Sequence, residues 1–138
     1  MTIKVKWQGG KAFEATSSTG HKVMMDASKE VGGEDKGSRP MEMLLMGLGG
    51  CSGIDVIMML EKGKQAVKDC QMEITSERAE GIPAVYTQIN LHFKITGSDL
   101  NDKKVARAVE LSAQKYCSVS KMLEKTAEMT HSYEVIEA

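Results

Sequence analysis

The sequence predicts an α+β fold in which an antiparallel sheet wraps a long buried central helix, with residues 1–138 forming a single domain. The run 41–60 is apolar or small at almost every position, and Glu42 and Asp55 are its only charges, which is typical of a helix buried on most sides. The segment 84–97 alternates apolar and polar residues, as a half-buried strand does. Patterns of this kind give the element order βββ-α-ββ-αα-β.

The N-terminal residues predict a small antiparallel meander. Short apolar runs at 3–7, 12–18 and 22–27 are separated by glycine-containing turns. The next segment, 28–39, is polar and contains glycines, so we expect a loop there.

Pro40 then opens the long helix, because the missing N–H of a proline has no partner in the first helical turn. Four glycines follow inside this helix, and each lowers helix propensity by up to about 1 kcal/mol. We therefore expect a packing reason for them, such as the close approach of another backbone or access to the thiol at Cys51. These glycines are Gly47, Gly49, Gly50 and Gly53.

The C-terminal half predicts two strands, two helices and a last strand. The strands are expected at 70–79 and 84–97, the helices at about 101–116 and 119–127, and the last strand at 132–136. A sheet of this size is too small to cover a wholly buried helix in one chain. The sequence therefore predicts a tightly packed homodimer.

Composition excludes several classes of protein. The chain of 138 residues is 41% hydrophobic and 27% charged with a net charge of −1, which argues against disorder and against a general affinity for nucleic acid. No apolar leader begins the chain, and no run reaches membrane-spanning length without charges, so we expect no membrane partner and a cytoplasmic location. Three cysteines, an odd number, suggest free thiols rather than a disulfide framework.

Cys51 and Cys117 carry the most specific chemistry in the sequence. Each lies in an apolar, helix-like stretch beside small residues, and neither belongs to a CxxC motif. If the fold brings them together, they make a thiol pair that cycles between dithiol and disulfide. Cys70, which begins a strand beside Asp69, is interpreted as a packing residue.

Other chemistries fit less well. The histidines stand singly, at positions 21, 92 and 131, and no cysteine or histidine pair has the spacing of a structural zinc site, so no metal is expected. The glycines around Cys51 match neither the dinucleotide-binding motif G-x-G-x-x-G nor the P-loop, which ends in Gly-Lys-Ser/Thr. No cofactor is therefore expected. A cysteine hydrolase is an alternative, but its nucleophile elbow follows a strand, whereas Cys51 is in a predicted helix.

Two motifs resemble those of the OsmC/Ohr proteins. Residues 40–51 look like the central-helix motif of that family, in which a proline and an acidic residue begin the helix that carries the reactive cysteine. Residues 113–120 are similar to its second cysteine motif, Cys-Pro-x-Ser, with Ser118 in place of the proline. The element order matches along essentially the whole chain.

The resemblance implies an OsmC-like fold, an intertwined homodimer with two active sites at the interface, and a thiol-dependent peroxidase. Its substrates would be organic hydroperoxides and, more weakly, hydrogen peroxide. Cys51 would attack the peroxide to give a sulfenic acid, and Cys117 would resolve it as a disulfide. An external dithiol, such as a dihydrolipoyl protein, would reduce that disulfide.

The residues that would stabilise the thiolate depart from the family pattern. The nearest match to the family's N-terminal arginine is Lys11, which keeps the charge but not the planar fork. The family's glutamate position holds Met41, with Glu42 one step further, and Arg39 is a second possible cation. Nine residues place Glu42 roughly opposite Cys51 around a helix axis, where it would instead complement the helix dipole. A non-enzymatic OsmC-like protein that binds a small hydrophobic ligand at the dimer interface is the remaining alternative.

Overall fold

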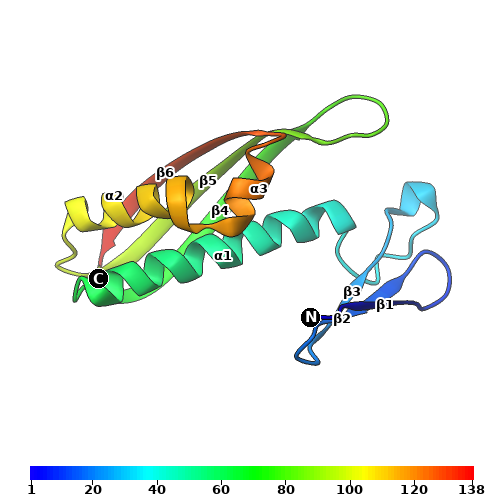
Figure 1. Ribbon diagram of the computed structural model, residues 1–138, viewed down its shortest axis with the longest axis horizontal. Coiled ribbons are helices and arrows are strands. Elements are labelled where there is room, and N and C mark those ends of the chain that lie inside the picture. The colour runs from blue at the N-terminus through cyan, green and yellow to red at the C-terminus, as the bar shows by residue number, and fades with distance from the viewer. The chain divides into compact units, whose positions relative to one another are not determined.

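The computed structural model describes residues 1–138, which fall into two compact units, Met1–Met46 and Gly47–Ala138. A long helix, α1 (Pro40–Lys62), contributes residues to both units. The other elements form two three-stranded sheets and shorter helices, so the predicted α+β class is confirmed (Figure 1). Whether the two units act as the single domain expected from sequence stays a prediction.

The first unit is the predicted meander of three strands, β1 (Lys4–Trp7), β2 (Phe13–Thr16) and β3 (Lys22–Met25). Both strand pairs are antiparallel, and a short 3-10 turn, η1 (Lys29–Val31), follows in the predicted loop. Within this unit only one apolar and one charged side chain are fully buried, and large apolar side chains of its strands stay exposed. A unit of this size with so little core is not stable by itself.

Asp26 organises the loop that leads to α1. Its carboxylate accepts the backbone N–H groups of Ala27 at 2.8 Å, Glu34 at 3.0 Å and Lys36 at 3.1 Å. The N–H groups of Lys36 and Glu34 are the main cause of a lowered pKa for the Asp26 carboxyl, because they favour its charged form. The loop therefore folds around a buried carboxylate.

In the second unit, α1 packs closely on strand β4 (Ala66–Arg78). A Cβ atom at Gly49 would lie 3.1 Å from Cδ1 of Ile74, and one at Gly53 would lie 2.8 Å from Cε of Met72. These two glycines thus have a packing reason, although it is not the approach of another backbone, and a Cβ atom at Gly47 or Gly50 would meet nothing within 4 Å. The approaching groups are side chains of the sheet.

Strands β4, β5 (Tyr86–Ser98) and β6 (Glu128–Glu137) form the second sheet. The alternation predicted for β5 is confirmed, since Ile89, Leu91, Phe93 and Ile95 are all buried. Strand β4 pairs antiparallel with β5, but β6 runs parallel to β5. The sheet is thus mixed rather than wholly antiparallel, because a helical crossover connects β5 to β6.

That crossover contains α2 (Asp102–Leu111), a π-helical turn η2 (Ser112–Tyr116) and α3 (Ser118–Leu123). The prediction of two helices with a break at Cys117 is confirmed. The second helix is shorter than predicted, and β6 begins earlier than the predicted last strand.

The burial of α1 is one-sided in the single chain. Its buried residues include Leu48, Val56 and Leu60, whereas Ile54 is 63% and Met58 49% exposed. With a mean hydropathy of 1.8, α1 is long and apolar enough to cross a membrane by length and composition alone. Core helices of soluble proteins share these properties. An apolar face of α1 is therefore left for another surface to cover.

We expect Asp26→Asn to lower the melting temperature at pH 7. A carboxyl group whose pKa is lower in the folded than in the unfolded protein stabilises the fold at pH values above the unfolded-state pKa. That stabilisation is lost as the pH falls through the folded-state pKa. The difference between wild type and variant should therefore narrow below about pH 4. Thermal unfolding followed by circular dichroism across this range checks the prediction, with the exposed Glu30→Gln as control. A pH-independent difference would contradict it.

Candidate thiol site

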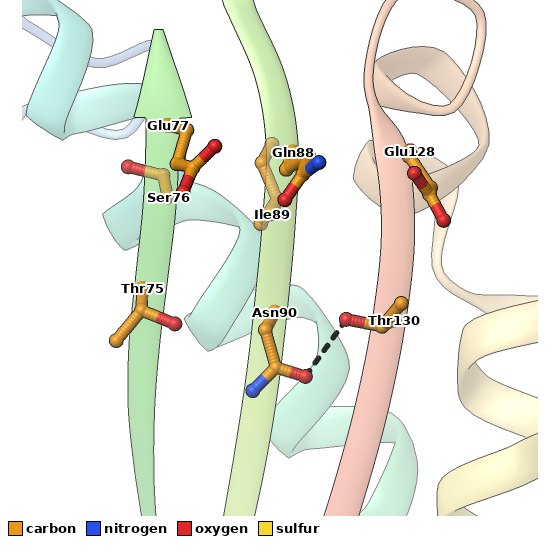
Figure 2. Close-up of a pocket in the computed structure, with 8 residues that line it drawn as sticks. All are labelled: Thr75, Ser76, Glu77, Gln88, Ile89, Asn90, Glu128 and Thr130. Atoms are coloured by element: carbon orange, nitrogen blue, oxygen red, sulfur yellow. Dashed lines mark hydrogen bonds between the residues drawn. The ribbon is translucent and has the colours of Figure 1, made fainter.

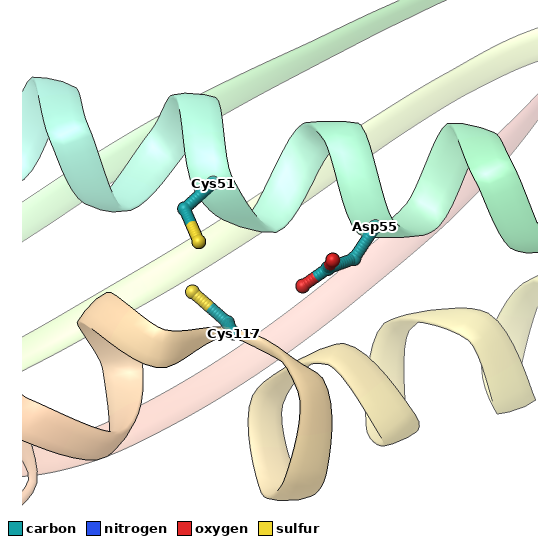
Figure 3. A group of neighbouring side chains, drawn as sticks. All are labelled: Cys51, Asp55 and Cys117. Atoms are coloured by element: carbon teal, nitrogen blue, oxygen red, sulfur yellow. The ribbon is translucent and has the colours of Figure 1, made fainter.

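The structure brings together the two cysteines singled out in the sequence. Cys51 lies on α1, and Cys117 lies between η2 and α3. Their sulfur atoms and a carboxylate oxygen of Asp55 all lie within 4.8 Å of one another. Figure 3 shows the two sulfurs facing each other, with the Asp55 carboxylate beside them. Both cysteines are free thiols. The site therefore holds a dithiol with a carboxylate beside it.

Cys117 is held from several directions. Its side chain is fully buried, and its sulfur accepts hydrogen bonds from the Ser52 hydroxyl at 3.2 Å and from the Ser120 backbone N–H at 3.3 Å. Its own N–H donates to the carbonyl of Ser112 at 2.9 Å, which closes the π-helical turn. Such turns occur often at functional sites.

Burial is the main cause of a raised pKa for the Cys117 thiol. The donors from Ser52 and Ser120 act in the opposite direction, since they favour the thiolate, while the neighbouring Cys51 adds to the increase. Cys51 itself is only half-buried. The pair is therefore asymmetric, with one accessible sulfur and one enclosed sulfur.

Asp55 is the site residue that sequence reasoning missed. It follows Cys51 by four residues, so both side chains lie on one face of α1. The hydroxyl of the fully buried Ser112 lies 3.3 Å from Oδ2 of Asp55 and 3.4 Å from the carbonyl of Ser52. The available signal was a charge four residues after the cysteine in an otherwise apolar helix.

The three predicted thiolate-stabilising residues lie in the first unit, Met1–Met46. The Arg39 guanidinium donates to Asp35 at 3.2 Å and to the carbonyl of Gly37 at 3.0 Å. Glu42 accepts the backbone N–H of Arg39 at 3.0 Å, which is half of a capping box at the start of α1. Lys11 is exposed. Any role of these three toward Cys51 stays a prediction.

The remaining cysteine lies apart from the pair in the fold. Cys70 is half-buried on β4, opposite Ile95 of β5. Burial, followed by the charge of Asp69, raises the pKa of its thiol. This placement fits its interpretation as a packing residue.

Cavities on the second unit include one beside the thiol pair and one over the sheet. One of about 220 Å³ is lined by Ser52, Ser112 and Ser120 and by side chains of the sheet and α3, so it borders the hydroxyl groups around Cys117. The other, of about 260 Å³, lies over the three strands and is lined largely by polar groups (Figure 2). Thr130 donates to Asn90 there at 2.8 Å, and no cysteine lines it. Of these two cavities, the first is the one that adjoins the Cys51–Cys117 pair.

Comparison with known proteins gives consistent matches. The family model for the OsmC-like protein matches residues 33–132. Protein YhfA of Escherichia coli K12 is 54% identical over 138 residues, covering all of both chains. A hypothetical protein of Aquifex aeolicus VF5 is 31% identical with a TM-score of 0.87, covering 99% of this chain and 96% of that one. An organic hydroperoxide resistance protein of Elizabethkingia anophelis, 18% identical over 100% of this chain and 97% of its own, has a TM-score of 0.71, which concerns the fold alone.

We expect iodoacetamide to modify Cys51 at least about tenfold faster than Cys117 in the folded, reduced protein. Cys51 is half-buried, whereas Cys117 is enclosed and the pKa of its thiol is raised. Peptide mass spectrometry over a time course measures both rates, and the rates in urea serve as the control for intrinsic reactivity. Equal rates in the folded protein would contradict the asymmetry of the site.

Proposed function

The chain belongs to the OsmC-like protein family, and on that premise we propose that it is a thiol-dependent peroxidase. Its substrates are organic hydroperoxides and, more weakly, hydrogen peroxide. The observation that carries the proposal is the convergence of the Cys51 and Cys117 thiols, from two separate elements, within 4.8 Å. The name of the structurally similar Elizabethkingia protein, organic hydroperoxide resistance protein, supports this substrate class.

In the proposed reaction, the Cys51 thiolate attacks the terminal oxygen of the hydroperoxide. The O–O bond breaks, the alcohol leaves with a proton, and Cys51 becomes a sulfenic acid. The Cys117 sulfur then attacks the Cys51 sulfur, which forms a disulfide and releases water. An external dithiol, as in a dihydrolipoyl protein, restores both thiols and is itself oxidised to a disulfide.

The asymmetry of the pair supports these two roles. Cys51 is the accessible sulfur and is therefore the one that a peroxide reaches. Cys117 is enclosed, so it meets the Cys51 sulfenic acid rather than bulk peroxide. The hydrogen bonds from Ser52 and Ser120 stabilise negative charge on Cys117 as it attacks. In this proposal a cation, either Lys11 or Arg39, supplies the positive charge that favours the Cys51 thiolate.

We further propose that the protein acts as a homodimer in the cytoplasm. Apolar side chains of both units are exposed in the single chain, among them Trp7 at 62% and Ile54 at 63%. The exposed apolar face of α1, which includes Ile54 and Met58, is suited to burial against a second copy.

Cys51→Ser is expected to abolish consumption of tert-butyl or cumene hydroperoxide with a dithiol reductant, because the attacking sulfur is lost. Cys117→Ser should still form a sulfenic acid at Cys51, which dimedone traps, but no intramolecular disulfide. Cys70→Ser is the matched control and should retain full activity. Consumption is followed by peroxide assay, and the oxidised sulfurs by mass spectrometry after one equivalent of peroxide.

Three results would each contradict the peroxidase. Full activity of Cys51→Ser would show that Cys51 is not the nucleophile. Unmodified thiols after peroxide treatment would favour the non-enzymatic binding protein. Ester turnover without reductant would favour the cysteine hydrolase.

Ile54→Glu is expected to shift the protein from dimer to monomer, because a charge buried in an apolar interface without a partner is costly. Ile82→Glu is the matched control, since Ile82 is 101% exposed on the loop between β4 and β5, and it should leave the dimer intact. Light scattering coupled to size exclusion gives the mass of each form. A monomeric wild-type protein would contradict the dimer.

A further inference from the structure

We propose that Cys51, Asp55 and Cys117 form a Zn²⁺ site in the reduced protein, with a water molecule as the fourth ligand. The spacing of cysteines and histidines along the chain predicts no metal site. Spacing along the chain identifies only ligands that are close together in sequence. These three residues come from two separate segments, α1 and the turn before α3.

The geometry fits a tetrahedral zinc ion. The two sulfur atoms and the carboxylate oxygen lie within 4.8 Å of one another. Zn–S bonds of about 2.3 Å place two sulfur ligands about 3.8 Å apart in a tetrahedron, and a Zn–O bond of about 2.0 Å places the oxygen about 3.5 Å from each sulfur. Each pair of ligand atoms therefore needs to approach by at most about 1.3 Å. Small side-chain rotations supply such a movement. Figure 3 shows the two sulfurs facing each other, with the Asp55 carboxylate extending into the same space from α1.

The ligands are also oriented by a surrounding set of hydrogen-bond donors. Ser112, fully buried, lies within 3.3 Å of the Asp55 carboxylate. Ser52 and the Ser120 N–H donate to the Cys117 sulfur. Donors of this kind hold metal ligands in place and stabilise the charge on a thiolate. Two of the three ligands thus have a supporting partner before any ion binds.

Charge gives an independent reason. Asp55 takes part in none of the ion pairs of the protein, although it lies half-buried in an apolar helix beside two thiols. A divalent cation is attracted to all three groups and displaces the two thiol protons as it binds.

The donor set selects the class of metal. Two thiolates and one carboxylate suit Zn²⁺, whereas Mg²⁺ and Ca²⁺ take oxygen ligands in larger number. Three protein ligands leave one position for water, as in zinc sites that remain open. The half-exposed Cys51 leaves this position accessible.

Zinc binding has a consequence that rests on the proposed function. A bound ion holds both sulfurs as ligands, so oxidation must release it. The two thiolates give up two electrons, the O–O bond of the hydroperoxide breaks, two protons are taken up, and the products are the disulfide, an alcohol, water and free Zn²⁺. Bound zinc should therefore slow peroxide consumption, and peroxide should release zinc.

The direct test needs no peroxide. The reduced full-length protein is titrated with Zn²⁺ against a chromophoric chelator, and we expect one ion per chain. Asp55→Asn should weaken binding at least about tenfold, Cys51→Ser should weaken it more, and Ser112→Ala should weaken it less. The variant with Asp69→Asn and Cys70→Ser removes a carboxylate and a thiol elsewhere and should bind as the wild type does.

Co²⁺ in place of Zn²⁺ provides a second readout. It uses the wild-type protein, so it does not depend on whether a variant folds. Coordination by two thiolates gives strong sulfur-to-cobalt charge-transfer absorption in the unmutated protein. Absence of that absorption, failure to bind Zn²⁺, or equal zinc affinity in Asp55→Asn and wild type would each overturn the three-ligand site. None of these results bears on peroxide turnover, so the zinc site and the peroxidase fail separately.

Discussion

The close approach of α1 to strand β4 is the constraint on which the site depends. Gly49 and Gly53 favour it, because a Cβ atom at these positions would press on the side chains of Ile74 and Met72 and require them to shift. Cys51 lies two residues from each glycine, so the helix turns it away from the sheet and toward the crossover that carries Cys117. The reacting groups are therefore placed by the packing of a helix on a sheet rather than by flexible loops. This rigidity favours chemistry that needs two sulfurs at a fixed separation.

Much of this arrangement could be predicted from the sequence, because it depends on local periodicity. The alternation in β5, the proline at the start of α1 and the break at Cys117 all reflect short-range patterns that the structure confirms. The parallel pairing of β6 could not be predicted in this way, since a strand's own pattern does not specify its neighbour's direction. Asp55 was overlooked for a related reason. A charge on a helix acquires meaning only when the group that faces it is known, and Cys117 lies 62 residues further along the chain.

The two proposed activities draw on different properties of the same atoms. Peroxide reduction uses electrons of the sulfurs and leaves them bonded to each other. Metal binding uses their lone pairs and keeps them apart. Asp55 distinguishes the two proposed activities, because it would bind the metal ion but supplies no electrons to peroxide. Ser52 and Ser120 serve both, since each stabilises charge on the Cys117 sulfur. The same folded framework thus supports either state, and the surrounding concentrations of oxidant and metal determine which one prevails.

The parallel ladder between β5 and β6 also affects the order in which the contacts of the fold can form. The β4–β5 hairpin needs only neighbouring segments, whereas β6 pairs with β5 across the whole crossover, which closes a long loop. Cys117 belongs to that crossover. A chain whose synthesis has stopped before Glu128 already contains all three cysteines, yet lacks the strand that fixes the crossover against the sheet. The framework that holds Cys117 opposite Cys51 is therefore complete only with the last strand of the chain.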